Sequence, residues 1–303
     1  MRPNKRVRNL ISLLVVLGMG LIWSSSFFLN QEKEVVELPV KFGKFSSPFI
    51  DVEIESKKYP LHLDLGFDCQ LSLNKSILDS IQKTEYEMWP HIDFRGRKYT
   101  SPSFFIEKVK IGGILFYGIV AKERNLEFCE NTSISVKIIG KNPPGLSKTT
   151  GSIGLNLLNR ANLLLDFPSS RICITNHLKR LKKAHELFKK WIKAPFTIDR
   201  GILVIIETDL GPKRFMLDTG STVTWIRSSS LSKDQLKVGD LGLPFFPNSK
   251  FVIGDHDFGA WNLYSLDIAP ELDFIDGFLG MDFLKNHSTY IDFSKHLLSI
   301  SGG

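Results

Sequence analysis

Cysteine is scarce in this sequence, with only Cys69, Cys129 and Cys173 among 303 residues. Three thiols cannot build a disulfide framework, and their separations lack the paired spacing that structural zinc sites require. We therefore expect at most one disulfide and no metal site. The seven histidines contain no His-x-x-x-His spacing, and the sequence shows no motif of a serine or cysteine nucleophile. Metal-dependent and triad hydrolysis are accordingly unsupported.

Acidic residues are absent from the first 31 positions, whereas Arg2, Lys5, Arg6 and Arg8 lie there. The whole chain has 39 Lys and Arg against 32 Asp and Glu, a formal net charge of +7. Those four basic residues contribute +4, so the remainder of the chain carries only +3. Because nucleic-acid binding needs a strongly basic surface, we expect no nucleic-acid partner.

An apolar segment follows the basic start and occupies residues 10–29. About twenty such residues can span a bilayer as one helix, and the positive flank should stay in the cytoplasm. We therefore predict that residues 1–30 are a single-pass membrane anchor and that the bulk of the chain is extracytoplasmic. A cleaved secretory signal is the alternative, with Ser24 and Ser26 ahead of Phe27 as the cleavage site.

The rest of the chain favours strands. Hydrophobic residues at 43% and charged residues at 23% are typical of a globular protein. Short apolar runs bounded by Gly, Pro and Asp predict an all-β fold, and examples are Phe49–Ile54, 111–120, Ile202–Ile206 and 251–253. The exception is residues 176–195, where apolar side chains recur at helical spacing among Lys and Arg, so we predict a basic linker helix there.

An internal repeat lies on either side of this linker. Residues 59–67 align with residues 213–221, and the alignment pairs two Asp-x-Gly turns, each preceded by an apolar strand: Asp64-Leu65-Gly66 and Asp218-Thr219-Gly220. Further along, residues 151–158 align with 277–284, and each of these segments contains an apolar residue followed by Gly. Both halves then continue to a strand that ends in Asp-Phe. The sequence therefore predicts two similar lobes, at 31–175 and 196–303.

The repeat resembles the pepsin and retropepsin superfamily of aspartic peptidases. Residues 217–221 carry the family's hydrophobic-Asp-Thr-Gly-Ser signature, and residues 278–280 its hydrophobic-hydrophobic-Gly element. The resemblance implies two six-stranded, barrel-like lobes that face each other across a cleft. It also implies that Asp64 and Asp218 are the catalytic pair, supported by Gly66, Thr219, Gly220 and Ser221. One chain would supply both halves, so we expect a monomer with an internal pseudo-two-fold axis.

Two carboxyl groups about 3 Å apart cannot easily both ionise, so they share a proton. One carboxylate then activates a water while the other protonates the scissile carbonyl, and no cofactor is needed. We expect the hydroxyl of Ser221 to orient Asp218. The substrate expected from the resemblance is a polypeptide, covered by a flap for which Trp89, Phe94 and Tyr99 are candidates.

The first lobe departs from the family pattern at two positions. Leu65 stands where the family has Thr, whose hydroxyl helps to lock the two turns together, and Phe67 stands where Ser or Ala is usual. These departures leave an alternative open, in which the chain is a catalytically inactive protein that binds peptide or protein in the cleft.

Overall fold

The computed structural model describes residues 35–124, 150–175, 191–239 and 242–302. The predicted anchor or signal segment lies outside these residues, as does most of the predicted linker helix. No helix among the described residues is both long and apolar enough to cross a membrane. Residues 35–303 form one compact unit, and the description below concerns that unit.

The first lobe is a six-stranded barrel. Its strands lie in the order β3-β4-β9-β5-β8-β7, and pairing of β3 with β7 closes the barrel. β2 and β6 extend this sheet at its two ends. The strand bounds are β2 Lys41–Phe42, β3 Pro48–Ile54, β4 Lys57–Asp64, β5 Leu71–Leu73, β6 Thr84–Ile92, β7 Lys98–Ile111, β8 Ile114–Glu123 and β9 Gly151–Gly154.

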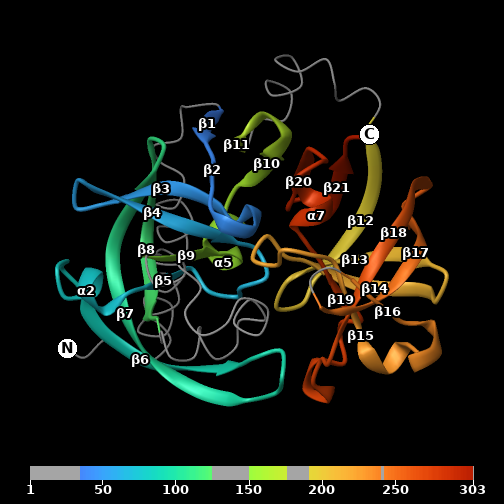
Figure 1. Cartoon of the computed structure of the whole chain (residues 1–303). Helices are drawn as coiled ribbons and strands as arrows, with labels where there is room; N and C mark the ends of the chain where they lie inside the picture. The colour runs from blue at the N-terminus through green and yellow to red at the C-terminus, as the bar shows by residue number, and fades with distance from the viewer. Residues whose placement is uncertain (1–34, 125–149, 176–190, 240–241, 303) are drawn as a thin grey trace, which may run out of the picture. The chain divides into compact units, whose positions relative to one another are not determined.

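The second lobe repeats this arrangement in the order β13-β14-β19-β15-β18-β17, closed by pairing of β13 with β17. Figure 1 shows the two barrels as the blue-green and the yellow-red halves of the described chain. The bounds are β13 Ile202–Thr208, β14 Gly211–Leu217, β15 Trp225–Arg227, β16 Lys237–Val238, β17 Pro244–Ile253, β18 His256–Leu266 and β19 Gly277–Leu279. The prediction of two six-stranded, barrel-like lobes is therefore confirmed.

Six further strands join the lobes in the order β1-β11-β10-β20-β21-β12. The junction is the antiparallel pair of β10 and β20, where Leu164 faces Tyr290. At this seam Ser288 donates a hydrogen bond of 2.8 Å to Asp166, which also pairs with Arg171. The bounds are β1 Val36–Pro39, β10 Asn162–Asp166, β11 Arg171–Thr175, β12 Ile192–Ile198, β20 Thr289–Asp292 and β21 Leu297–Ile300.

Helices in the described residues are single turns. They are η1 Lys44–Ser46, α2 Lys75–Leu78, α5 Leu155–Leu158, η3 Phe167–Ser169, η5 Ser228–Ser230, η6 Lys233–Gln235, η7 Pro270–Leu272 and α7 Met281–Leu284. α5 and α7 follow Gly154 and Gly280, the glycines of the repeated apolar-Gly element. A Cβ on either glycine would overlap backbone carbonyl oxygens of the adjacent Asp-x-Gly loop, so close packing requires Gly here.

Two details of the sequence interpretation are wrong. The predicted linker helix extended to residue 195, but residues 192–195 belong to β12, which pairs with β21. Ile192 and Ala194 point inward while Lys193 is exposed, so a period of two replaces the helical period at this point. The apolar run 111–120 is likewise not one strand, because Gly112 and Gly113 form a turn with positive φ between β7 and β8.

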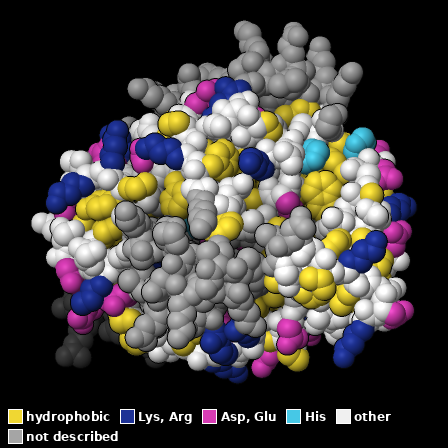
Figure 2. Space-filling model, in the orientation of Figure 1, with side chains coloured by type: hydrophobic (Ala, Val, Ile, Leu, Met, Phe, Trp, Pro, Cys, Tyr) yellow, Lys and Arg dark blue, Asp and Glu magenta, His cyan; other side chains and the backbone are white. Residues whose placement is uncertain are grey.

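Basic side chains do not gather on the face drawn in Figure 2. Lys and Arg are interspersed there with Asp and Glu, and apolar side chains lie between them. Both described cysteines, Cys69 and Cys173, are buried free thiols. Burial raises the pKa of the Cys173 thiol to about 12, so this thiol is protonated near neutral pH.

Candidate active site

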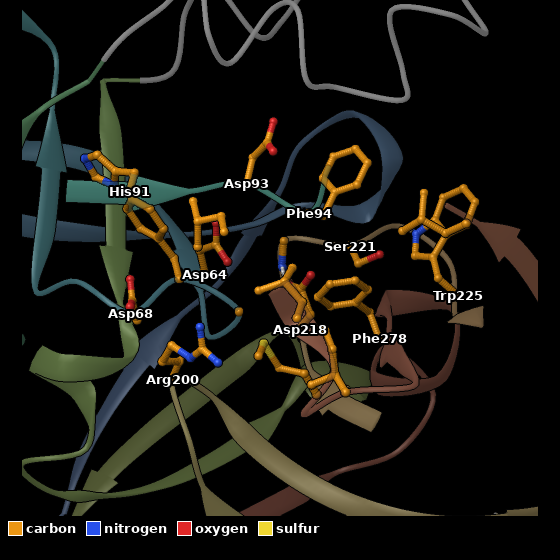
Figure 3. A pocket seen from close by; sticks show the side chains of 18 of the residues that line it. Asp64, Asp68, His91, Asp93, Phe94, Arg200, Asp218, Ser221, Trp225 and Phe278 are labelled. Carbon is orange, nitrogen blue, oxygen red and sulfur yellow. Dashed lines mark hydrogen bonds between the residues drawn. The ribbon is translucent and has the colours of Figure 1, made fainter. Parts of the chain in front are cut away.

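Each predicted aspartate lies at the end of a strand in the middle of its barrel. Asp64 is the last residue of β4, which runs parallel to β9, and Asp218 follows β14, which runs parallel to β19. Leu61 and Leu63 of β4 point into the core, so the alternation of the strand directs His62 and Asp64 the other way. The two carboxyl groups lie close enough for each to change the pKa of the other. Figure 3 shows them side by side at the floor of a cavity.

The two glycines of the turns allow this approach. A Cβ on Gly66 would overlap the carboxyl group of Asp218, and a Cβ on Gly220 would lie 2.7 Å from Oδ1 of Asp64. Neither glycine has a positive φ, so space and not backbone conformation excludes a side chain. Each turn also directs its own N–H at its own aspartate: Gly220 donates to Oδ1 of Asp218 at 2.8 Å, and Gly66 donates to Asp64.

Thr219 joins the two turns. Its hydroxyl accepts a hydrogen bond of 3.0 Å from the N–H of Leu65 and donates one of 2.6 Å to the carbonyl of Leu63. Both Thr219 and Leu65 are fully buried. Leu65 has no hydroxyl with which to return these bonds, and its side chain packs in the apolar core of the lobe instead. The lock between the lobes is therefore one-sided, as the sequence predicted.

The expected role of Ser221 is wrong in one respect. Its hydroxyl donates to the carbonyl of Val223 at 2.9 Å, and not to Asp218. The backbone N–H of Ser221 donates to the carbonyl oxygen of Asp218 at 3.2 Å, and from there it also lowers the pKa of the Asp218 carboxyl group. Ser221 therefore supports the carboxyl group through the main chain, while its hydroxyl tightens the loop that follows the turn.

The environment favours one shared proton. Burial raises the pKa of both carboxyl groups from 3.8, that of Asp64 to about 6 and that of Asp218 to about 8. For Asp218 the charge of Asp64 adds to the increase, whereas for Asp64 the cations Arg124 and Lys122 oppose it. The pair titrates as a unit, and between its two titration steps the two carboxyl groups share one proton.

A histidine that the sequence reasoning did not assign lies beside the pair. Nδ1 of His62 is 3.9 Å from Oδ2 of Asp64. Burial, with the charge of Arg124, lowers the pKa of His62 to about 4, so the ring is neutral near pH 7. His62 is therefore a polar neighbour of Asp64 and not its counter-ion.

The carboxyl groups open into a cavity of about 1030 Å³ between the two lobes. Its wall is mainly apolar and aromatic, with contributions from the hairpin of β6 and β7 and from the second lobe. Of the three flap candidates, Phe94 and Tyr99 line the cavity, and Trp89 does not. Arg200 also lines it, with its guanidinium 3.8 Å from the centre of the Phe274 ring.

The tip of the β6–β7 hairpin crosses the cavity and contacts the second lobe. The carbonyl of Phe94 accepts a hydrogen bond of 2.8 Å from the N–H of Ala269. Ile92 and Phe94 pack against a cluster that includes Leu272 and Phe274. The receiving loop is held by Arg227, whose guanidinium donates to four backbone carbonyls, those of Ile268, Ala269, Leu272 and Ile275. We refer to this hairpin as the flap, and in this structure its tip rests on the second lobe.

No group of three or more His, Cys, Asp or Glu residues that could hold a metal ion occurs in the described ranges. The arrangement contains what acid–base hydrolysis needs, namely a desolvated pair of carboxyl groups with one proton between them, in a cavity large enough for an extended peptide segment.

No protein-family model matches the sequence, and no curated protein matches it either. Solved structures do resemble the fold. A crystal structure of an aspartic proteinase from Irpex lacteus superimposes with a TM-score of 0.58 at 12% identity, covering 89% of this chain and 97% of that one. Basic 7S globulin from soybean superimposes with a TM-score of 0.55 at 12% identity, covering 89% and 95%. The chain has the pepsin-like aspartic peptidase fold. In this fold the duplicated Asp-x-Gly turns of the sequence occupy equivalent places in the two lobes.

The one-sided lock predicts a stability effect. Thr219→Val removes the hydroxyl at nearly constant volume and leaves the buried N–H of Leu65 without its acceptor. We expect the free energy of unfolding to fall by about 1–3 kcal/mol. Chemical denaturation measures this, with Thr222→Val as the matched control, because Thr222 is exposed and a surface change is worth no more than about 0.5 kcal/mol. Equal stability of the two variants would contradict the lock.

Proposed function

We propose that this chain is an aspartic endopeptidase with the dyad Asp64 and Asp218. The observation that carries the proposal is the reciprocal packing of the two turns, in which each glycine leaves room for the carboxyl group of the opposite lobe. A surface turn in a relic lobe would have no need of that space. The raised pKa values of the two carboxyl groups, each of which affects the other, support the same conclusion.

The asymmetry of the pair assigns the roles. Asp64, the more acidic partner, is the carboxylate that accepts a proton from the attacking water. Asp218 holds the proton that passes to the oxygen of the scissile carbonyl. The water adds directly to the carbonyl carbon, so no covalent enzyme intermediate forms. Two carboxyl groups and a water complete this chemistry without a cofactor.

The cavity favours a polypeptide substrate with apolar side chains near the cleaved bond. Its lining includes Phe67, Tyr99, Met216, Trp225 and Phe278. The flap covers the same region and would exclude bulk water when substrate is bound. One chain supplies both aspartates, so a monomer is sufficient for the proposed activity.

A non-catalytic binding protein is the second candidate. Leu65 weakens the lock between the turns, and the flap is closed over the carboxyl groups by the Phe94–Ala269 hydrogen bond. The fold is also similar to that of a protein described as a globulin. In this alternative the cleft would hold a peptide or protein segment without cutting it.

Catalysis by the pair predicts that Asp64→Asn and Asp218→Asn each lower kcat by about 10⁴-fold or more. The two carboxyl groups act as one unit, so replacing either one removes most of the catalysis. The assay incubates residues 31–303 with a mixed peptide library, with and without a hydroxyl-bearing transition-state mimic as inhibitor. Asp79→Asn is the control, since Asp79 is exposed on the first lobe. No cleavage by the unaltered protein would favour the binding protein, and full activity of Asp64→Asn would place Asp218 opposite its copy in a second chain.

The pKa values predict the pH profile of the activity. The singly protonated pair is the active form, and it dominates between about 6 and about 8. Activity should rise as the pH increases through the lower value, because Asp64 then ionises, and fall above the upper value as Asp218 loses its proton. Measuring kcat from pH 3 to pH 9 checks this, and an optimum near pH 3 would contradict the strong desolvation of the pair.

We also propose that the chain is a single-pass membrane protein with its N-terminus in the cytoplasm and its lobes exported. The support is the basic start followed by the apolar residues 10–29. The chain should fractionate with membranes, and protease added from the exported side should digest the lobes. A soluble mature form that begins near Phe27 would show a cleaved signal instead, and lobes protected in the cytoplasm would contradict both versions.

A further inference from the structure

A buried lysine lies directly behind the first catalytic turn. Lys122 of β8 is only 2% exposed, although it carries a charged side chain. Its Nζ lies 3.8 Å from the centre of the Phe67 ring, a distance at which a cation is attracted to the face of an aromatic ring. Phe67 follows Gly66, so the ring that replaces the usual small residue covers the ammonium group. This contact gives a physical role to Phe67, which stands where the family usually has Ser or Ala.

The other side of the ammonium group contacts the flap. Nζ of Lys122 is 2.9 Å from Nδ1 of His91, which belongs to β6. A lysine ammonium can only donate, so Nδ1 accepts and His91 is the neutral tautomer with its proton on Nε2. The His91 ring is stacked on Tyr99 of β7, with 4.5 Å between ring centres. Lys122 therefore contacts both strands of the flap, one directly and one through the stack.

The two contacts connect the flap to the turn that carries Asp64. Phe67 and His91 both line the cavity, whereas Lys122 lies behind them. Figure 3 shows His91 on the flap side of the cavity, with Asp64 beyond it. The tip of the flap is held separately, on the second lobe, by the hydrogen bond of Phe94 with Ala269. The strand ends next to the tip of the flap are thus linked to the turn that carries Asp64, and the tip itself to the lobe that carries Asp218.

We propose that Lys122 is a positioning residue that ties the closed flap to the first catalytic turn through His91 and Phe67. Opening the flap would break the hydrogen bond between Lys122 and His91, and the loss of this buried bond disfavours the open state. The same charge acts on Asp64, whose other charged and titratable neighbours are Arg124, Asp218, His62 and Cys69. The effect on catalysis rests on the proposed peptidase function, but the tie itself does not.

Hydrogen exchange of the full chain tests the tie without any need for activity. Lys122→Met keeps the length of the side chain and removes the ammonium group. Amides of residues 84–105 should exchange at least tenfold faster in this variant than in the unaltered protein, while amides of β13 and β14 should not change. Lys108→Met is the matched control, since Lys108 is exposed on β7 of the same hairpin. Equal exchange of the flap in both variants would overturn the proposal.

His91→Phe provides a second route if Lys122→Met does not fold. The new ring can still stack on Tyr99, but it offers no acceptor to Lys122. The flap amides should again exchange at least tenfold faster, and unchanged exchange would overturn the proposal as well. Since neither measurement depends on cleavage, failure of the proposed peptidase function would leave both results interpretable.

The pH profile separates positioning from a purely structural role. The charge of Lys122 lowers the pKa of Asp64, so Lys122→Met should shift the acid limb of kcat upward in pH. Lys108→Met should leave that limb in place. An acid limb that does not move in Lys122→Met, measured on a folded and active variant, would overturn the coupling between Lys122 and Asp64.

Discussion

The close approach of the Asp64 and Asp218 carboxyl groups is the constraint on which the arrangement of the site depends. Two buried carboxylates would repel each other and lose hydration, so the arrangement is stable only when one of them keeps a proton. The fold accommodates that constraint with parallel strands that end at the same point, with glycines that leave space, and with backbone N–H groups aimed at each carboxyl group. The neighbouring charged groups of the site change the pKa values of these two carboxyl groups.

The two lobes perform unequal tasks despite their common architecture. The second lobe contributes Thr219, which reaches across to the main chain of the first, and Arg227, which holds the loop that receives the flap. The first lobe replaces its half of the lock with the apolar packing of Leu65. It also places a cation beside the turn, so the two carboxyl groups differ in acidity. In the proposed mechanism this difference in acidity between Asp64 and Asp218 would separate the base from the acid.

The barrels, the meeting of the two Asp-x-Gly turns and the one-sided lock could be predicted from the sequence, because the duplicated Asp-x-Gly and apolar-Gly elements recur in the same order. The role of Ser221 could not be predicted, because only the geometry of the loop places its hydroxyl against the carbonyl of Val223 and away from the carboxyl group of Asp218. His91 and Lys122 are 31 positions apart and belong to no motif, so their contact appears only when β6 and β8 fold around the same turn. The end of the linker was misplaced because Ile192 and Ala194 fit a strand through their pairing with β21, which local spacing does not reveal.

The central claim is that Asp64 and Asp218 share one proton within a single chain. Carbon NMR of protein with labelled Asp carboxyl groups tests it most directly, with each signal assigned by its loss in the corresponding Asn variant. We predict two signals that titrate far above the usual aspartate range, and a clear fall in the pKa of Asp218 when Asp64 is replaced by Asn, since the charge of Asp64 raises it. Two carboxyl groups that titrate independently near 3.8 would contradict the account.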